Sequence, residues 1–308
     1  MISQSCNAPR NNPLDPENPD NKIGMLEGVV QTVKVPRAPI TNAEIFWANE
    51  GIITSTDSKG YFSIENIERT DGWLSIKKEN YSSDSVYITF NDQKKISENI
   101  FLNAIPKINE LYFYSITINK FPSNQKYNLE IIADITDEEN DIDSVFIENI
   151  ELNASKQLLY NSSSKVYENS LFLNDLNVTS IDAVIGKEFQ ITVFDADQKK
   201  FVIGKSNIKR IIKEEILTTS PSGRDTVFTL KPFFEWRRFT PGFEFYYLLE
   251  IYTDEIQEEL VFETKINSSE INYQSEVSIG PGEFFWVIWA IDEFNNRTRS
   301  KPASFIIK

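Results

Sequence analysis

The sequence predicts an all-β protein, with three tandem β-sandwich domains behind a disordered N-terminal tether. Nearly every apolar segment is a run of strand length that is rich in aromatic and β-branched residues, and clusters of turn residues separate the runs. At 308 residues the chain is long enough for two or three domains of ordinary size. Repeated short strands spaced by turns are typical of β-sandwiches, in which two sheets pack face to face.

The first predicted domain covers residues 22–105. Apolar and polar residues alternate in Tyr61–Ile64, as in a half-buried strand, and no segment of this domain has a helical period. The cluster Asp57–Gly60 is a hairpin turn signal. Gly60 stands where the turn needs a positive φ, which glycine adopts without steric cost.

The second predicted domain covers residues 106–212 and the third covers residues 213–308. Both consist of strand-length runs separated by polar clusters, and aromatic residues dominate the runs of the third domain. The segment 202–216 permits two interpretations, a short helix or a strand followed by a charged linker.

Residues 1–21 form the predicted tether. They contain four prolines with several asparagines and acidic residues, and almost nothing apolar occurs before Ile23. Such a segment cannot bury enough surface to offset its ordering entropy, so we expect it to be extended and solvated. Cys6, the one cysteine of the chain, lies near its start.

Charge and composition exclude several classes of function. The net charge is −15, so the chain has no basic stripe for nucleic acid and no attraction to an anionic membrane surface. No run approaches the roughly 18 apolar residues of a membrane helix. The chain contains no histidine, the commonest general base and metal ligand, and one cysteine permits no internal disulfide. We therefore predict a protein that is not an enzyme.

An acidic cluster raises the possibility of calcium binding. Asp137, Glu139 and Asp141 follow a calcium-loop spacing, but Ile142 replaces the glycine that the EF-hand requires and the flanking segments are predicted strands. A second arrangement places calcium between sandwich loops, with Asp195 and Asp197 reaching across. The plainer interpretation, which we favour, is a solvated turn of an acidic protein without a cofactor.

The five tryptophans suggest a second kind of site, because flat rings can stack on sugar faces. Strand spacing places Trp236 and one of Trp286 and Trp289 in the core. Trp47 and Trp73 are the candidates for carbohydrate stacking, although core packing is the usual fate of such rings.

The first domain resembles the carboxypeptidase regulatory-like domain, a transthyretin-like β-sandwich that serves as an accessory module of bacterial surface proteins. The matching segments are Gly28–Val30, Pro39–Ile45 and Thr56–Ile64. The zinc carboxypeptidases that carry this module need histidine ligands, so their activity does not extend to this chain.

The other two domains each resemble a different family of β-sandwich domains. The third is similar to bacterial fibronectin type III domains through Trp236, Tyr246–Ile251 and Pro281–Trp286. The second is loosely similar to bacterial immunoglobulin-like domains through residues 134–149 and 191–200.

The start of the chain is similar to the mature end of bacterial lipoproteins, which implies a lipid on Cys6. Ser3 stands where a lipobox has an apolar residue, so the alternatives are a removed leader, a gene start assigned too late and an unmodified thiol. We expect a lipid-anchored cell-envelope protein, periplasmic or surface-exposed, whose domains bind or scaffold other envelope proteins or glycans. The alternatives are a carbohydrate-binding adhesion protein and a structural subunit of an envelope assembly bound through strand edges.

Overall fold

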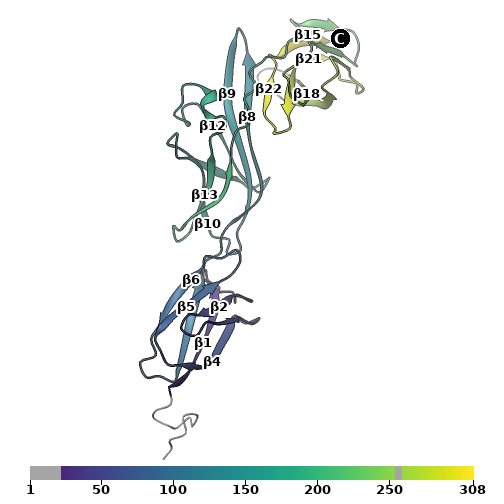
Figure 1. Ribbon diagram of the computed structural model, residues 1–308. Coiled ribbons are helices and arrows are strands. Elements are labelled where there is room, and N and C mark those ends of the chain that lie inside the picture. The colour runs from purple at the N-terminus through teal and green to yellow at the C-terminus, as the bar shows by residue number, and fades with distance from the viewer. Residues whose placement is uncertain (1–21, 254–258) are drawn as a thin grey trace, which may run out of the picture. The chain divides into compact units, whose positions relative to one another are not determined.

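Strands make up nearly all the regular structure in the computed structural model, which describes residues 22–253 and 259–308 (Figure 1). Within these ranges there is no α-helix, and the one helical element is a 3-10 turn, η1 (Ile181–Val184). Accordingly, no helix in these ranges is long and apolar enough to cross a membrane. The predicted all-β fold class is confirmed. The tether and Cys6 lie outside the described residues.

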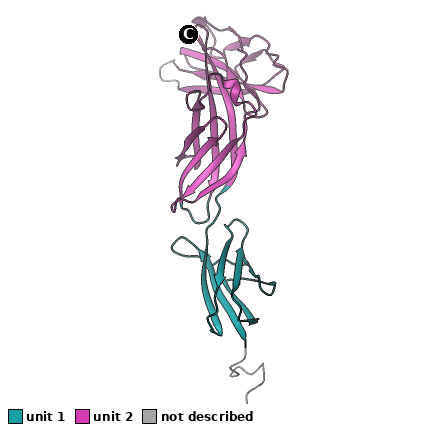
Figure 2. Cartoon of the chain, turned by 60° about the vertical axis from the view of Figure 1, so that its left-hand side comes forward, with its two compact units in different colours: residues 1–107, 137–141 teal, residues 108–136, 142–308 magenta. Residues whose placement is uncertain are grey.

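The chain divides into two compact units (Figure 2). Unit 1 contains residues 1–107 together with the short segment 137–141, and unit 2 contains residues 108–136 and 142–308. Residues 22–105, the first predicted domain, lie within unit 1, whereas residues 137–141 of the same unit belong to the second predicted domain.

Unit 1 contains two sheets. The three-stranded sheet has the order β4 (Tyr61–Glu68), β1 (Ile23–Thr32), β7 (Lys95–Leu102), and the four-stranded sheet has the order β3 (Ile52–Ser55), β2 (Glu44–Trp47), β5 (Gly72–Lys77), β6 (Asp84–Ile88). Every second residue of β1 is buried, because successive side chains of a strand point to opposite faces. Leu26 and Val30 pack in this way into an apolar core that contains Ile45, Trp47 and Leu74.

Turn chemistry fixes the connections of unit 1. Gly60 has a φ of 74°, as predicted, and a Cβ at this position would lie 2.4 Å from the carbonyl oxygen of Val30. The buried hydroxyl of Thr56 accepts the amide N–H of Ala43 at 2.8 Å and donates to the carbonyl of Ile40 at 2.6 Å. A polar side chain in the interior is thereby satisfied, as burial requires.

The first half of unit 2 contains seven strands. Their order is β14 (Lys200–Ser206), β13 (Phe189–Asp195), β10 (Ile142–Asn149), β11 (Ala154–Asn161), β12 (Val166–Phe172), β9 (Asn124–Thr136), β8 (Lys107–Lys120). Strand β11 pairs with β10 over residues 154–158 and with β12 over residues 159–161, so it passes from one layer to the other. The segment 202–216 is a strand followed by a linker, and the helical alternative is wrong.

The second half of unit 2 is a sandwich of the kind that the fibronectin type III resemblance implies. One sheet has the order β15 (Thr218–Ser220), β17 (Phe233–Trp236), β20 (Asn272–Gln274). The opposing strands are β19 (Leu260–Asn267), β18 (Phe245–Tyr252), β21 (Gly282–Asp292), β22 (Arg297–Arg299) and β23 (Ala303–Ile307), and β16 (Asp225–Val227) pairs parallel with β23. Trp236 and Trp286 are buried in the core between them, as predicted.

The two halves of unit 2 share one continuous sheet. Strand β22 of the second half pairs parallel with β8 of the first half, with Arg297 opposite Ile116 and Arg299 opposite Ile118. The boundary expected near residue 212 is therefore crossed by backbone hydrogen bonds as well as by the linker (Figure 1).

Candidate functional site

The acidic turn between β9 and β10, residues 137–141, belongs to unit 1 and forms hydrogen bonds with it. The buried carboxylate of Glu139 accepts the amide N–H of Lys34 at 2.9 Å and that of Ala104 at 2.8 Å, one on each oxygen. The hydroxyl of Tyr81 donates to Glu138, and partial burial together with this hydrogen bond raises the pKa of the Tyr81 phenol. Glu139 thus serves as an acceptor for backbone amides in this structure.

The structure does not gather the five carboxylates considered for calcium into one unit. Asp137 accepts the amide N–H of Asp141 at 3.1 Å within the turn, whereas Asp195 and Asp197 belong to unit 2. The buried carboxylate of Asp195 accepts the amide N–H of Lys199 at 2.8 Å and so closes the β13–β14 hairpin. Among residues 22–253 and 259–308 no group of three or more acidic side chains is arranged to hold a metal ion. Calcium binding stays an untested alternative to the favoured interpretation, a solvated turn.

The two tryptophans considered for carbohydrate stacking have opposite environments. Trp47 is fully buried in the core of unit 1 and packs edge-on against Phe90 with 6.4 Å between ring centroids, so the expectation of a stacking role for this ring is wrong. Trp73 has 53% of its surface exposed. The difference follows from strand alternation, because Trp47 points to the same side of β2 as Ile45, whereas Trp73 points away from Leu74 and Ile76.

Trp73 lies on an aromatic surface that the sequence analysis did not identify. It stands directly opposite Tyr87 in the β5–β6 ladder, and the two rings make an edge-to-face contact with 5.2 Å between centroids. Phe46 and the exposed Ile53 face each other across β2 and β3 in the same sheet. The signal in the sequence was the alternation of Gly72–Lys77, which places Trp73 on the side of Ser75 and Lys77.

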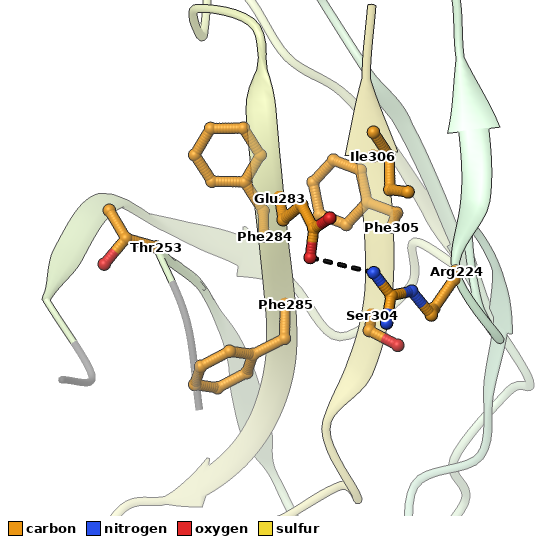
Figure 3. Close-up of a pocket in the computed structure, with 8 residues that line it drawn as sticks. All are labelled: Arg224, Thr253, Glu283, Phe284, Phe285, Ser304, Phe305 and Ile306. Carbon is orange, nitrogen blue, oxygen red and sulfur yellow. Dashed lines mark hydrogen bonds and ion pairs between the residues drawn. The ribbon is translucent and has the colours of Figure 1, made fainter. Parts of the chain in front are cut away.

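Unit 2 has a shallow cavity of about 280 Å3 at the outer strands of its second half (Figure 3). The guanidinium of Arg224 and the carboxylate of Glu283 form an ion pair of 2.9 Å across it. Phe285 stacks on Tyr252 with 5.1 Å between ring centroids, and Ser304 lies on the neighbouring strand. The two charged groups are paired with each other, and the rest of the lining combines hydroxyl groups with the rings of Phe284, Phe285 and Phe305.

A buried polar seam joins the two halves of unit 2. We define it by Ser115, Thr117 and Asn119 of β8 and by Asp292, Asn296 and Thr298 of the facing hairpin, all of which are buried. The side-chain oxygen of Asn296 accepts the amide N–H of Ser115 at 2.9 Å, and the side-chain amide of Asn119 donates to the carbonyl of Arg299 at 2.8 Å.

The linker between the two halves also contacts the seam. The Asp292 carboxylate lies 3.4 Å from the guanidinium of Arg210, and that group stacks over Phe243 at 4.2 Å from the ring centroid. The hydroxyl of Thr298 donates to the carbonyl of Glu214 at 3.2 Å. Hydrogen bonds between buried polar groups restrict the alternatives in packing, so those made by Ser115, Asn119 and Thr298 fix how the two halves meet.

Acid should weaken the first half of unit 2 through Asp175. The hydrogen bond from the ammonium of Lys156, at 2.8 Å, and the amide N–H of Phe172 lower the pKa of the Asp175 carboxyl below its ordinary value of 3.8. A lowered folded-state pKa means that the unfolded chain takes up the proton first as the pH falls. The resulting stability is therefore complete above about pH 4 and is lost as the pH falls through the folded-state value.

We expect Asp175→Asn to lower the free energy of unfolding by up to about 1 kcal/mol at pH 7 and by a smaller amount at pH 3. Urea denaturation at both pH values measures the difference. Lys156→Met removes the same ion pair from the other side and should show the same pH dependence. An Asp175→Asn effect of equal size at both pH values would contradict this account.

Comparison with known proteins adds little beyond the fold class. No protein family model matches the chain, and no curated protein matches it. Among solved structures, the chicken CNTN1 FN1–FN3 domains are 8% identical, with a TM-score of 0.35, 87% of this chain covered and 91% of that one. The fibronectin(III)-like modules of Clostridium thermocellum CbhA are 11% identical, with a TM-score of 0.30 and coverages of 66% and 93%.

The Bacillus anthracis TIE protein is 13% identical, with a TM-score of 0.24, and the match covers 93% of this chain and 48% of that one. These likenesses are too weak to carry an argument about site or function. The fold instead rests on the strand pairing itself, which makes the chain an all-β protein of packed sheets with a fibronectin type III-like sandwich at its C-terminal end.

Proposed function

We propose that this chain is a non-catalytic binding or scaffolding protein of the bacterial cell envelope, anchored by a lipid on Cys6. The observation that carries the scaffolding part is the buried seam. Asn296, Asp292 and Thr298 bond with β8 and with the linker, so two sandwiches are held in one fixed arrangement. A fixed pair of domains can present surfaces at a constant spacing, which is the physical requirement of a scaffold.

The anchor is supported by the sequence. A polar, proline-rich segment of 16 residues lies between Cys6 and the first strand, which begins at Ile23. Fully extended, such a segment reaches at most roughly 60 Å, which is long enough to hold a folded domain clear of a membrane surface. A thiol in an exported protein without a second cysteine has no intramolecular partner for a disulfide.

Intact-mass spectrometry tests the anchor. The protein is expressed from its native locus, with its upstream sequence, and is extracted with detergent. We expect a chain that begins at Cys6 and carries a diacylglyceryl adduct, and Cys6→Ser should abolish both the cleavage and the adduct. A wild-type chain that begins at Met1 with no added mass would refute the lipid anchor.

A second candidate function is carbohydrate binding, and the exposed Trp73–Tyr87 pair favours it. It is compatible with the first, because a scaffold in the envelope can also hold a glycan. The competing role of a structural subunit would use exposed strand edges, and chemical cross-linking in native membranes would then yield a partner in fixed stoichiometry.

A further inference from the structure

The outer face of the four-stranded sheet of unit 1 is apolar at its centre. Strand alternation sends Ile45, Trp47, Leu74 and Ile76 into the core, so their neighbours point outward. The register of the four strands then places the following outward residues on one surface, which we call the aromatic face: Glu44, Phe46, Ile53, Ser55, Trp73, Ser75, Lys77, Ser85 and Tyr87.

Two exposed rings dominate the aromatic face. Trp73 and Tyr87 are 53% and 52% exposed, although they contact each other with their planes inclined at 69°. An edge-to-face contact covers only one side of one ring, so ring surface is left for a ligand. The C–H bonds of a pyranose carry slight positive charge and can lie flat on the negative π-face of such a ring.

Polar groups suited to sugar hydroxyls surround the rings. The hydroxyls of Ser75 and Ser85 lie 3.3 Å apart, two residues along the strands from the ring pair, and either of them can donate or accept. A few polar groups beside an apolar surface are what orient a small ligand.

The aromatic face has no net charge, although the whole chain has a net charge of −15. Its two charged residues, Glu44 and Lys77, stand directly opposite each other in the β2–β5 ladder and cancel. A neutral ligand therefore meets no opposing charge on this surface. A polyanion would be repelled by the acidic remainder of the protein.

The aromatic face is too small for a stable protein partner. Its strands contain four to six residues each. At about 3.3 Å per residue and 4.8 Å between strands, the face covers roughly 300 Å2. A stable protein interface buries about 800 Å2 on each partner.

We propose that the aromatic face of unit 1 binds a neutral polysaccharide, with Trp73 and Tyr87 as the stacking rings. This inference rests on the binding function proposed above and assigns it to one surface.

Native affinity electrophoresis of the full chain tests the proposal. The gels contain mixed-linkage β-glucan, xylan or galactomannan, which are neutral, or polygalacturonate, which is anionic. We expect at least one neutral polymer to retard the protein and polygalacturonate not to retard it. Trp73→Ala and Tyr87→Ala should each weaken the retardation by about tenfold. Phe228→Ala, which removes an aromatic ring 82% exposed on unit 2, is the matched control and should change nothing.

Circular dichroism and thermal melting establish that each variant is folded, and the two ring variants provide independent tests if one of them is not. The proposal is overturned if no neutral polymer retards the chain, if polygalacturonate retards it as strongly, or if Phe228→Ala acts like Trp73→Ala. Such a result would leave the lipid on Cys6 and the cross-linked partner untouched, so failure of the glycan site is distinguishable from failure of the envelope role.

Discussion

Asp292→Ala is expected to lower the free energy of unfolding of unit 2 by about 3 kcal/mol. The Asp292 side chain is fully buried, and one of its oxygens accepts the amide N–H groups of Phe294 at 2.8 Å and Asn296 at 2.9 Å. The other oxygen accepts the side-chain amide of Asn296 at 3.1 Å and faces Arg210. Alanine would leave the donors on Phe294 and Asn296 without an acceptor and would remove the nearer carboxylate from Arg210. Each unsatisfied buried donor costs about 1–3 kcal/mol.

The effect should extend from the β21–β22 turn to β8. Asn296, which Asp292 holds in place, accepts the amide N–H of Ser115, so hydrogen exchange at the Ser115 amide should accelerate in Asp292→Ala. Chemical denaturation measures the loss of stability. Glu293→Ala is the matched control, because Glu293 is exposed and lies 3.8 Å from the same guanidinium. A surface ion pair of this kind contributes less than about 1 kcal/mol. Equal losses in the two variants would mean that the seam does not hold unit 2 together.

Glu139→Ala is expected to lower the free energy of unfolding of unit 1 by about 2–4 kcal/mol. The Glu139 carboxylate is the acceptor for the amides of Lys34 and Ala104, which lie 70 residues apart in the sequence. Removal of the carboxylate would leave both amide donors without an acceptor. Water cannot easily replace it, because Glu139 is only 8% exposed. Glu139→Gln should retain part of the stability, because its carbonyl oxygen can accept one of the two bonds.

Hydrogen exchange at the Lys34 and Ala104 amides is the sharpest measurement for Glu139, since both should lose protection together in Glu139→Ala. Glu138→Ala, one residue away, removes an exposed carboxylate that accepts only the hydroxyl of Tyr81. Its effect should stay below about 1 kcal/mol and leave both amides protected. If the Lys34 and Ala104 amides keep their protection in Glu139→Ala, the Glu139 carboxylate does not stabilise unit 1.

Local chemistry made much of the fold predictable. The turn at Asp57–Gly60 required a positive φ, which is found at Gly60. Strand spacing assigned Trp236 and one of Trp286 and Trp289 to the core, and the structure buries Trp236 and Trp286 there. The helical alternative for residues 202–216 failed because the charged residues that suggested it follow the strand and belong to an irregular linker. Such features depend on a few neighbouring residues, so the sequence contains what is needed to predict them.

The candidate sites were harder to predict. Trp47 and Phe46 are both apolar, so alternation alone does not tell which of the two faces the core. Glu139 was considered as a calcium ligand because its spacing fits a loop, although a solvated turn was favoured; in the structure its carboxylate oxygens accept amide N–H groups from two distant segments. Trp73 was identified, but its partner Tyr87 becomes its neighbour only through the pairing of β5 with β6.

By itself the sequence determined that this protein folds into sheets, where its tight turns lie, and that histidine-based chemistry is closed to it. Only the tertiary structure decided which face of β8 is buried. Ser115, Thr117 and Asn119 point inward, while Ile116 and Ile118 between them remain partly exposed, the reverse of the usual pattern. The physical reason is that burial of polar side chains is favourable mainly where partners satisfy them. Here Asn296 accepts a hydrogen bond from Ser115, and Thr298 and the Arg299 carbonyl accept from Asn119, so the partners come to β8 from the far end of the chain.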